Sequence, residues 1–278
     1  MNIALDVINN LAIVFAIGMV FSIFEYIWPI DKKIIVPFRK ESFQDTLWLL
    51  TSSFLPSLIN AFIIWTYSFL LGFFFINLDA LPFKKINLDN LFLQFVILLL
   101  SVDFLKYIFH VYFHRSIWWC SHMLHHSAEK IDWLTGQRGH WVEDWLLGTV
   151  LILPVSIFVF NPKVYYIFSI VQFMSGYINH ANINISLGVL TPYIANPKVH
   201  RWHHSPTNFK KGGQNFGDLT LIWDHLFNTF YMPDHVSTPI VYGLFAGDRY
   251  PKSFFGRFFH PIIFLYNRAK GKLRTKFS

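Results

Sequence analysis

Hydrophobic residues along this chain gather into long runs, and the length of each run predicts what it forms. An α-helix needs about 20 apolar residues to cross the hydrocarbon core of a bilayer. The run from Leu11 to Ile30 has that length, and charged residues that begin at Asp31 end it. The run from Thr46 to Ile76 is longer than one span needs and contains Pro56, so it predicts either one tilted or kinked helix or a tight hairpin.

Three further runs complete the pattern. The run from Leu88 to Phe113 begins apolar and gains polar residues toward its end, so we expect a span whose last turns emerge into protein or water. The runs Trp145 to Phe160 and Val164 to Ile178 are each short for a full span. The turn signal Asn161-Pro162 between them predicts a membrane hairpin that crosses the bilayer fully or in part. The whole pattern predicts an all-α integral membrane protein with about four transmembrane helices.

Composition supports a membrane protein. Of the 278 residues, 54% are hydrophobic and only 14% are charged, whereas a soluble domain usually carries about 25% charged residues. The net charge of +7 would also fit a nucleic-acid binder. Because the lysines and arginines flank the hydrophobic runs, however, we interpret them as facing an anionic membrane surface and expect no nucleic-acid partner. The single cysteine, Cys120, excludes an internal disulfide and any thiolate cluster in this sequence.

Basic residues also suggest an orientation, because cytoplasmic loops of membrane proteins are enriched in lysine and arginine. The loop after the first run and the C-terminal segment are strongly basic, and the loop near residue 80 is less so. If Thr46 to Ile76 crosses the membrane once, the first loop, the C-terminal segment and the histidine clusters all face the cytoplasm. If that run is a hairpin, the argument fails.

Nine of the 13 histidines form patterned groups. One pair is four residues apart, two triplets have the spacing HxxHH, and one histidine stands between two asparagines. Side chains three and four residues apart share a helix face, so each triplet can present three imidazoles to one side. These candidate metal ligands are His110, His114, His122, His125, His126, His180, His200, His203 and His204.

The number of histidines limits the kind of metal site. A structural zinc takes four ligands, and a catalytic zinc commonly takes three from the protein. Nine ligands are too many for one ion and suit two ions of higher coordination number. Imidazole binds iron, zinc, copper and nickel, so the ligand type leaves the metal open. Without thiolates, iron–sulfur clusters and zinc fingers are disfavoured.

Other polar residues have weaker claims. His225, His235 and His260 lie outside the groups, so packing or interfacial roles explain them best. His140 could be a ligand, a hydrogen-bond partner of a ligand, or part of a substrate entrance. Asp103 lies seven residues before His110 on the same helix face, so we expect it to accept an N–H from a ligand histidine. Otherwise it would be an interfacial carboxylate paired with a nearby basic residue. Weaker candidates for orienting ligands are Asn179, Asn182, Asn215 and Asp224, and for Asp224 a structural cap is an equal alternative.

The histidine motifs resemble those of the fatty acid hydroxylase/sterol desaturase superfamily over residues 103–229. The segment from Asp103 to His110 is similar to its DFxxYxxH motif, and His122 to Ser127 reads HMLHHS, like HxxHHS. His200 to His204 resembles its HRxHH box. Further matches are Trp133 to Thr135 with Arg138, His140 and Glu143, then Asn179 to Asn182, Asn215 to Gly217, and Trp223 to Thr229. The combination is much more specific than any one motif.

Three positions depart from the family pattern. Val111 follows the first histidine where the family usually has arginine, Trp141 replaces a proline, and Asn228 replaces a glycine. None of these removes a candidate ligand. They make the subfamily, and with it the substrate, harder to assign.

The resemblance implies two irons, with zinc as a possible substitute, O2 as co-substrate, and a separate electron donor similar to cytochrome b5 or ferredoxin. It implies hydroxylation or desaturation of a lipid, which could be a sterol, a fatty acyl lipid or an ether lipid, and a place in the bacterial inner membrane or endoplasmic reticulum. A histidine-rich metal transporter is the main alternative, although transporters tend to place their sites near the bilayer midplane, often at repeat interfaces. A zinc hydrolase is disfavoured because no HExxH motif occurs.

The sequence indicates one integrated domain in three parts, because it contains no repeat, low-complexity tract or Gly/Ser linker. We expect N-terminal transmembrane helices in residues 1–90 and a catalytic region with a helical cap that carries the metal site in residues 91–235. A basic tail follows in residues 236–278.

Overall fold

The computed structural model describes residues 3–34, 39–73, 88–207, 213–233 and 238–271. Within these ranges the chain is helical and contains no strand, apart from two isolated antiparallel bridges that join Pro29 to Ile183 and Ile194 to Thr220. The predicted all-α fold is therefore confirmed for the described part of the chain. Its longer helices are α1 (Ile3–Ile27), α2 (Ser42–Phe54), α3 (Pro56–Phe73), α4 (Leu91–Arg115), α6 (Trp141–Ile157) and α7 (Pro162–His180).

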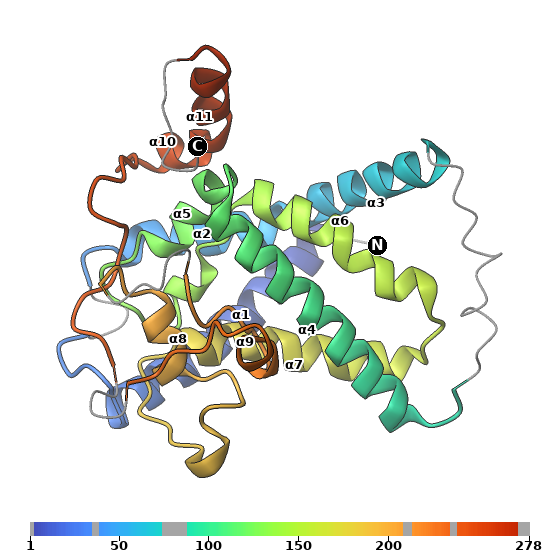
Figure 1. Ribbon diagram of the computed structural model, residues 1–278, viewed down its shortest axis with the longest axis horizontal. Helices are drawn as coiled ribbons and strands as arrows, with labels where there is room; N and C mark the ends of the chain where they lie inside the picture. Colours follow the sequence, from blue (N-terminus) through green and yellow to red (C-terminus); the bar gives the residue numbers. More distant parts are fainter. Residues whose placement is uncertain (1–2, 35–38, 74–87, 208–212, 234–237, 272–278) are drawn as a thin grey trace.

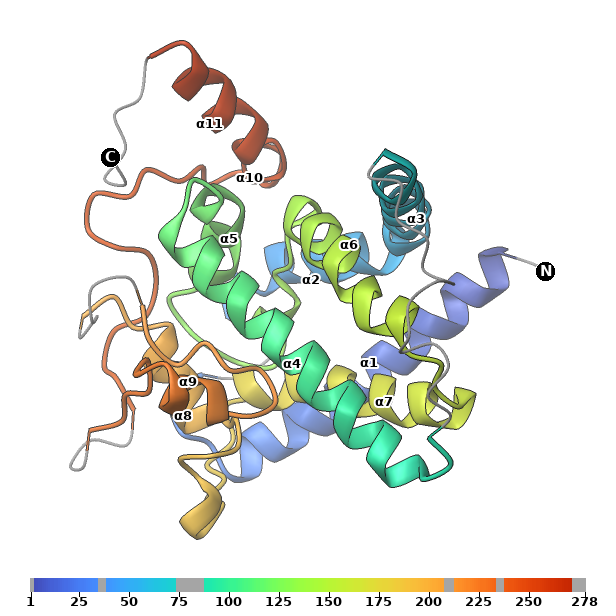
Figure 2. The same cartoon turned by 45° about the vertical axis from the view of Figure 1, so that its right-hand side comes forward.

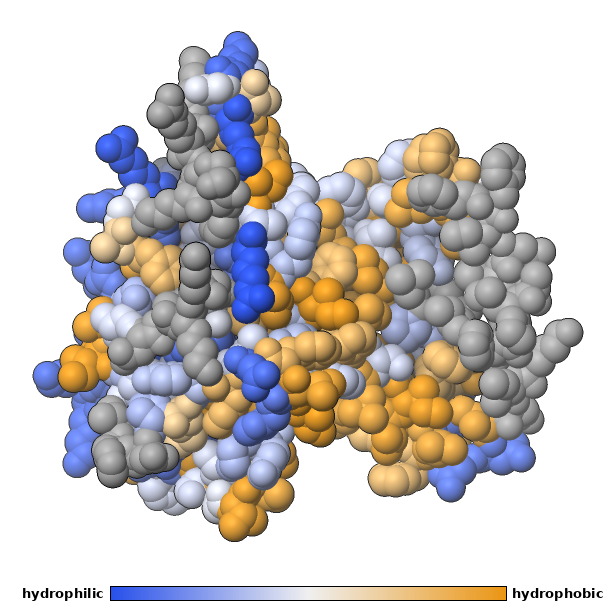
Figure 3. Space-filling model, viewed as in Figure 1, coloured by the Kyte–Doolittle hydropathy of each residue, from blue (hydrophilic) through white to orange (hydrophobic). Residues whose placement is uncertain are grey.

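Shorter helices lie at one end of these long ones. In Figure 1, α3, α6 and α7 run roughly from left to right and α4 crosses them diagonally, with the short helices gathered toward the left. The space-filling view in Figure 3 shows mostly hydrophobic residues over the centre and right and many hydrophilic residues on the left. The short helices are α5 (Trp119–His126), η3 (Thr135–Gln137), η4 (Gly188–Leu190), α8 (Pro197–His203), α9 (Ile222–Leu226), α10 (Phe254–Phe258) and α11 (His260–Ala269).

Helix α4 best matches a membrane span among the described residues. It has 25 residues, and it is long and apolar enough to cross a bilayer by length and composition. Asn90 caps its first turn by accepting a hydrogen bond from the Leu93 N–H. Two shorter apolar stretches, Ala12–Ile27 and Asn60–Phe73, accompany it. The expected total of about four spans, and the side of the membrane that the histidines face, stay predictions.

Pro56 divides the long second run into two helices. Helix α2 ends at Phe54, and α3 begins at Pro56, where the missing N–H of proline is tolerated in the first turn. In Figure 1, α3 continues to the right of α2 and does not return alongside it. Over residues 46–73 the run is therefore an interrupted helix and not a tight hairpin. The last three residues of the run lie outside the described part of the chain.

The predicted turn at Asn161-Pro162 separates helices α6 and α7, and their place in a membrane stays a prediction. Asn161 caps α7 by accepting from the Lys163 N–H, and Pro162 occupies the first turn. The turn is fixed to α4 because the Asn161 N–H donates to Gln94 Oε1 at 2.7 Å. A buried apolar cluster of Leu98, Val102, Phe160 and Val164 packs α4 against the same turn.

The end of α1 is fastened to the loops around the histidines. Glu25 is 3% exposed, and its Oε1 accepts hydrogen bonds from the backbone N–H groups of Trp133 and Asn182, both at 2.8 Å. One turn and more before Glu25, Gly18 leaves room for the Trp133 ring, because a Cβ atom at this position would collide with that ring. The N-terminal helix therefore packs directly on the region that carries the histidines.

Buried ion pairs connect α2 to the same region. Arg39 is paired with Asp45 and with Asp132, and Arg138 Nε donates to Asp45 at 2.5 Å. Each of these four side chains is at most 8% exposed. Breaking a buried pair by removing one partner leaves an uncompensated charge, at a typical cost of about 3–5 kcal/mol. The segment before α2 and the loop before α6 are thus held together.

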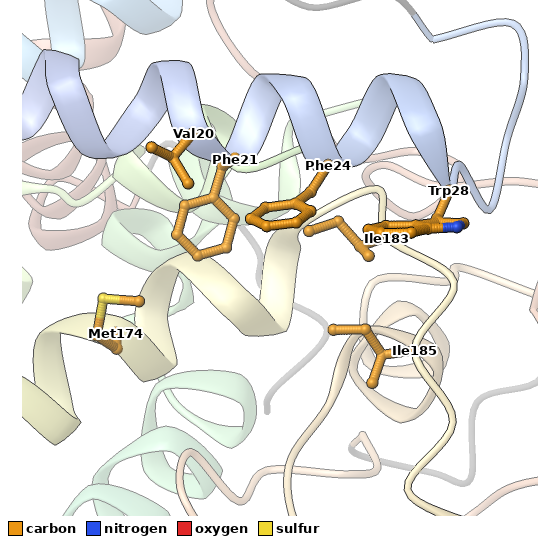
Figure 4. Close-up of a pocket in the computed structure, with 7 residues that line it drawn as sticks. All are labelled: Val20, Phe21, Phe24, Trp28, Met174, Ile183 and Ile185. Carbon is orange, nitrogen blue, oxygen red and sulfur yellow. The ribbon is translucent and has the colours of Figure 1, made fainter.

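An apolar pocket of about 340 Å³ lies between α1 and α7 (Figure 4). Phe21 and Phe24 project from α1 toward Met174 of α7, and Ile183 and Ile185 line the side formed by the following loop. Hydrocarbon, thioether and aromatic groups make up this lining, so the pocket suits apolar groups.

Candidate metal centre

All nine candidate histidines converge in the structure, in two adjacent groups that could each hold a metal ion. The ring nitrogens of each group lie within 4.8 Å of one another. Helix α4 contributes two of the histidines, α5 three, α7 one, and α8 with the residue after it three. The five-histidine group contains His110, His114, His122, His126 and His203; the four-histidine group contains His125, His180, His200 and His204.

Each HxxHH triplet is divided between the two groups. In α5, His122 and His126 belong to the five-histidine group and His125 to the four-histidine group. In α8 the division is reversed, because His203 alone joins the five-histidine group. With 3.6 residues per turn, the first and fifth positions of the motif lie about 40° apart around the helix, while the fourth lies about 60° to the other side. Each triplet therefore presents its imidazoles to two neighbouring sites. The sequence had predicted that all three would face one side.

In three histidines, the ring nitrogen that faces away from the group donates a hydrogen bond to a backbone carbonyl oxygen. This bond fixes which nitrogen carries the proton. The Nδ1 atoms of His110, His203 and His180 donate to the carbonyl oxygens of Phe216, Gln214 and Gly176 at 2.8, 2.8 and 3.0 Å. In the neutral ring the other nitrogen, Nε2, then has a free lone pair. These bonds orient the lone pairs toward the centre of each group.

Distances between the inner nitrogens fit a metal ion. His110 Nε2 lies 3.2 Å from His122 Nε2, and His200 Nε2 lies 2.9 Å from His180 Nε2. With metal–nitrogen bonds of about 2.1 Å, two ligands at right angles are about 3.0 Å apart, and two ligands at tetrahedral angles about 3.4 Å. Both separations therefore suit neighbouring ligands of one metal ion, at angles between a right angle and the tetrahedral angle. A cation would also relieve the repulsion between the lone pairs of His110 and His122.

Burial keeps four imidazoles of α5, α8 and the residue after α8 neutral. It lowers the pKa of His203 to about 3, and it lowers the pKa values of His126, His200 and His204 well below the ordinary value of 6.5. Neighbouring histidines add to the effect, since a second positive charge nearby is unfavourable. Metal ligation requires neutral rings, so the protein holds these side chains in the form that binds metal.

Glu143 is a polar contact of the site that the ligand pattern did not reveal. Its carboxylate accepts a hydrogen bond from His122 Nδ1, at 2.9 Å to Oε1. Carboxylates in this position orient a ligand histidine and increase its basicity. The sequence offered one signal, because Glu143 is part of the matched segment that follows Trp133.

We expect Glu143→Ala to bind metal about 10–100-fold more weakly than the wild type, because loss of such a partner frees the ligand ring. Competition with a chelator of known affinity measures the change. Glu143→Gln keeps an acceptor oxygen and should recover part of the loss, and Glu129→Ala, at an exposed position, serves as the control. Equal affinities for wild type and Glu143→Ala would refute the role of Glu143.

Close packing around His180 depends on a glycine. A Cβ atom at Gly136 would lie 3.0 Å from His180 Nδ1 and 2.9 Å from the Gly176 carbonyl oxygen, the two atoms that hydrogen-bond to each other. A larger residue at position 136 would displace the His180 ring. The sequence pattern did not identify this position.

Asp103 has a different role from the one expected. Its carboxylate accepts from the N–H groups of Leu219 and Thr220, from the Thr220 hydroxyl and from the Trp223 indole. The expected hydrogen bond from a ligand histidine is not among its interactions. Asp103 lies about two helical turns before His110 in α4, where it holds the loop before α9.

Asp224 and the asparagines support the same loops. Asp224 accepts from the Phe216 and Gly217 N–H groups at 2.8 Å, so it fixes the carbonyl of Phe216 that orients His110. Asn179 donates to the Asp218 carbonyl oxygen at 2.7 Å. Asn215 adopts φ 55° and spans the loop by donating to Val199 and Tyr231 carbonyl oxygens. These residues act on the ligands through backbone groups.

His140 lies apart from both groups. Its Nδ1 accepts from the Val142 N–H and thereby caps α6, and its Nε2 donates to the carbonyl oxygen of Phe258 at 3.1 Å. It connects α6 to α10. His225 is exposed, His260 contacts the Cys120 carbonyl oxygen, and His235 falls outside the described residues.

His140 should make stability depend on pH. Burial lowers its pKa from 6.5 to about 4. A histidine whose pKa is depressed in the folded state stabilises the fold above pH of about 6.5, and this contribution is lost as the pH falls toward about 4. We therefore expect the stability difference between wild type and His140→Gln to shrink between about pH 7 and pH 5. Thermal unfolding in detergent measures it, with His225→Gln as control; a difference independent of pH would contradict this role.

A comparison with known families identifies the region that holds these histidines. Residues 95–229 match the family model for fatty acid hydroxylase. This region is similar to the fatty acid hydroxylase family. The expected resemblance to the fatty acid hydroxylase/sterol desaturase superfamily is thereby confirmed. The matched region begins inside α4 and ends three residues after α9.

Individual relatives are lipid hydroxylases and monooxygenases by name. The chain is 28% identical over 146 residues to an ornithine lipid hydroxylase of Rhizobium tropici. It is 28% and 29% identical to alkylglycerol monooxygenases of Caenorhabditis elegans and Homo sapiens. Each match covers 52% of this chain but only 44%, 28% and 32% of the respective relative. No solved structure matches the chain. The transporter alternative is not favoured by these similarities.

Proposed function

We propose that this chain is a membrane-bound oxygenase that hydroxylates a lipid with O2, using two iron ions held by the nine histidines. One observation carries the proposal: two adjacent groups of five and four largely buried imidazoles have inner nitrogens as close together as neighbouring ligands of one metal ion. A lone structural zinc would take four ligands at tetrahedral angles. The hydroxylase family and the names of its relatives favour iron and oxygen chemistry over other uses of such a pair of sites.

When bound, the two irons supply the activation of O2 and the removal of hydrogen from an unactivated C–H bond. Hydroxylation converts one C–H bond and one O2 into an alcohol and one water, and it consumes two electrons and two protons. A separate electron-donor protein, similar to cytochrome b5 or ferredoxin, would supply the electrons. Desaturation begins with the same hydrogen removal and gives an alkene and two waters with the same electron input.

The protein contributes position and protection from water. Backbone carbonyls of the loop from Gln214 to Phe216 orient one ligand ring from α4 and one from α8. Glu143 orients His122 from the opposite side. The burial of His122, His126, His203 and His204, each at most 3% exposed, keeps bulk water from their rings. If these histidines hold the two irons, the exclusion of water would protect the chemistry that the irons supply from side reactions.

The substrate class follows from the relatives and the surroundings of the site. Relatives are named for ornithine lipids and for alkylglycerols, and α4, which carries two of the histidines, is long and apolar enough to span a bilayer. We propose a membrane lipid with an acyl or alkyl chain as substrate, and we place the site at the cytoplasmic face of a bacterial inner membrane or of the endoplasmic reticulum.

Mass spectrometry of membrane lipids tests the function. Cells that express the wild type should contain a lipid with one additional oxygen, absent from cells that express the His125→Ala/His203→Ala variant. Growth under ¹⁸O2 should place the heavy isotope in that lipid. Loss of two hydrogens instead would assign desaturation. Unchanged lipids together with metal uptake into vesicles containing the purified chain would overturn the proposal in favour of transport.

A further inference from the structure

The C-terminal helices α10 and α11 leave one apolar face uncovered. Phe255 is 72% exposed, and α11 with the residue before it exposes about half of each of four more large side chains. These four are spaced at positions i, i+3, i+4 and i+7, which is the pattern of one helix face. They are Phe259, Ile262, Ile263 and Tyr266.

The opposite side of this pair of helices is firmly attached to the rest of the protein. The Phe254 ring packs on Trp48 of α2, with 4.7 Å between the ring centroids. His140 donates to the Phe258 carbonyl oxygen, and His260 Nδ1 donates to the Cys120 carbonyl oxygen of α5 at 3.0 Å. The attachment fixes the direction of the apolar face. It also connects α11 to α5, the helix that carries three of the nine histidines.

Charge in this segment is entirely positive. Residues 252–278 include seven lysines and arginines and no aspartate or glutamate. Lys270 lies at the end of α11 with its ammonium 4.6 Å from the centre of the Tyr266 ring, which brings a positive charge to the edge of the apolar face. A large apolar face with a basic border is typical of helices that lie in a membrane interface.

The arrangement of the helices supports the same conclusion. In Figure 1, α11 stands nearly vertical, while α3, α6 and α7 run across the view. It lies toward the left, beside the histidine-bearing α5, and the turned view in Figure 2 shows the same two helices next to each other. In Figure 3 the hydrophobic side of α11 faces right, the direction in which the hydrophobic surface extends, and its hydrophilic side faces left.

We propose that α10 and α11 form an interfacial anchor that lies flat on the bilayer surface and binds anionic lipids. Ile262, Ile263 and Tyr266 enter the acyl boundary, and the basic residues contact anionic headgroups. A second copy of the chain is a poorer partner for this face, because two basic borders would repel each other. The proposal rests on the membrane location proposed above, and the test separates the two.

Spin labels at single cysteines test the anchor in the full-length chain. The buried Cys120 is replaced by alanine, and labels are placed at Ile263 on the apolar face, at Leu100 on the exposed side of α4, and at the exposed Lys130. Leu100 reports whether α4 lies in the bilayer, and Lys130 reports water. Accessibility to O2 and to a water-soluble nickel reagent is measured in nanodiscs of phosphatidylcholine, with and without phosphatidylglycerol.

We expect the Ile263 label to resemble Leu100 when phosphatidylglycerol is present, with high access to O2 and low access to nickel. Replacing Arg268 and Lys270 with glutamine should move the Ile263 label toward the Lys130 value, chiefly by weakening the response to phosphatidylglycerol. An Ile263 label that resembles Lys130 in both lipids, while Leu100 lies in hydrocarbon, would overturn the anchor alone. Short distances between Ile263 labels of two chains would assign the face to self-association. A Leu100 label in water would overturn the membrane location itself.

Discussion

His203→Ala and His125→Ala should each lose about one of the two bound metal ions. Either substitution should also abolish lipid oxidation. His203 belongs to the five-histidine group and His125 to the four-histidine group, so the two variants address different sites. Loss of a residue that merely orients a ligand typically weakens metal binding about 10–100-fold, and loss of the ligand itself should do at least as much. Combining both changes should leave no tightly bound metal.

Metal per chain, measured by elemental analysis after expression with ample iron, decides this prediction. His225→Ala is the matched control, because His225 is exposed and lies outside both groups. Circular dichroism verifies that each variant keeps its helices. A His203→Ala or His125→Ala protein that retains two irons would remove that residue from the ligand set. A wild type that binds no transition metal would refute the proposed chemistry.

Glu25→Leu should destabilise the chain and empty the four-histidine group. The buried Glu25 carboxylate is the acceptor for the N–H groups of Trp133 and Asn182, and Asn182 lies two residues after His180. Each buried donor left without a partner costs about 1–3 kcal/mol, so we expect a loss of about 2–6 kcal/mol in unfolding free energy. The segment that holds His180 would then be free to shift.

Two companion variants separate positioning from general stability. Glu25→Gln keeps the Oε1 acceptor and should restore metal binding. Ser22→Ala removes the acceptor for the Trp133 indole N–H but leaves the Asn182 contact, so it should lower stability without emptying the site. Metal content and thermal unfolding are measured on the same samples. Glu25→Leu with two bound metals would show that Glu25 does not position His180.

Glu25 also shows that the region matched by the family model is held in place by residues that precede it in the chain. The family match begins at residue 95, yet α1 supplies the acceptor that holds the His180 loop, and Arg39 and Asp45 pair with Asp132 and Arg138. Arg201, next to His200, donates to Asn182 Oδ1, so the same asparagine connects α1 to α8. Residues outside the matched region thus contribute to the geometry of the candidate site.

The sequence by itself determined the helical class, the nine candidate histidines and the resemblance to a family. Long apolar runs can satisfy their backbone only as helices in a membrane, and repeated spacings of three and four residues place imidazoles on the same helix face. Both patterns depend only on residues close in sequence, so they can be recognised without knowledge of the fold. The turn at Asn161-Pro162 was predictable for the same reason, because proline restricts the backbone within a few residues. At Pro56 the sequence left a kinked helix and a hairpin open, and the structure showed two successive helices.

Only the tertiary structure decided how these local features combine. The division of each HxxHH triplet between two groups depends on where α4, α7 and α8 pass around α5, and helical spacing alone does not specify that. Asp103 has the spacing of a ligand partner, but its carboxylate accepts hydrogen bonds from the loop before α9 and from Trp223 of α9. Glu25 and Glu143 lie far in sequence from the atoms that they hold, at 157 residues from Asn182 and 21 from His122. Periodicity describes one element at a time, whereas these contacts arise from the packing of several.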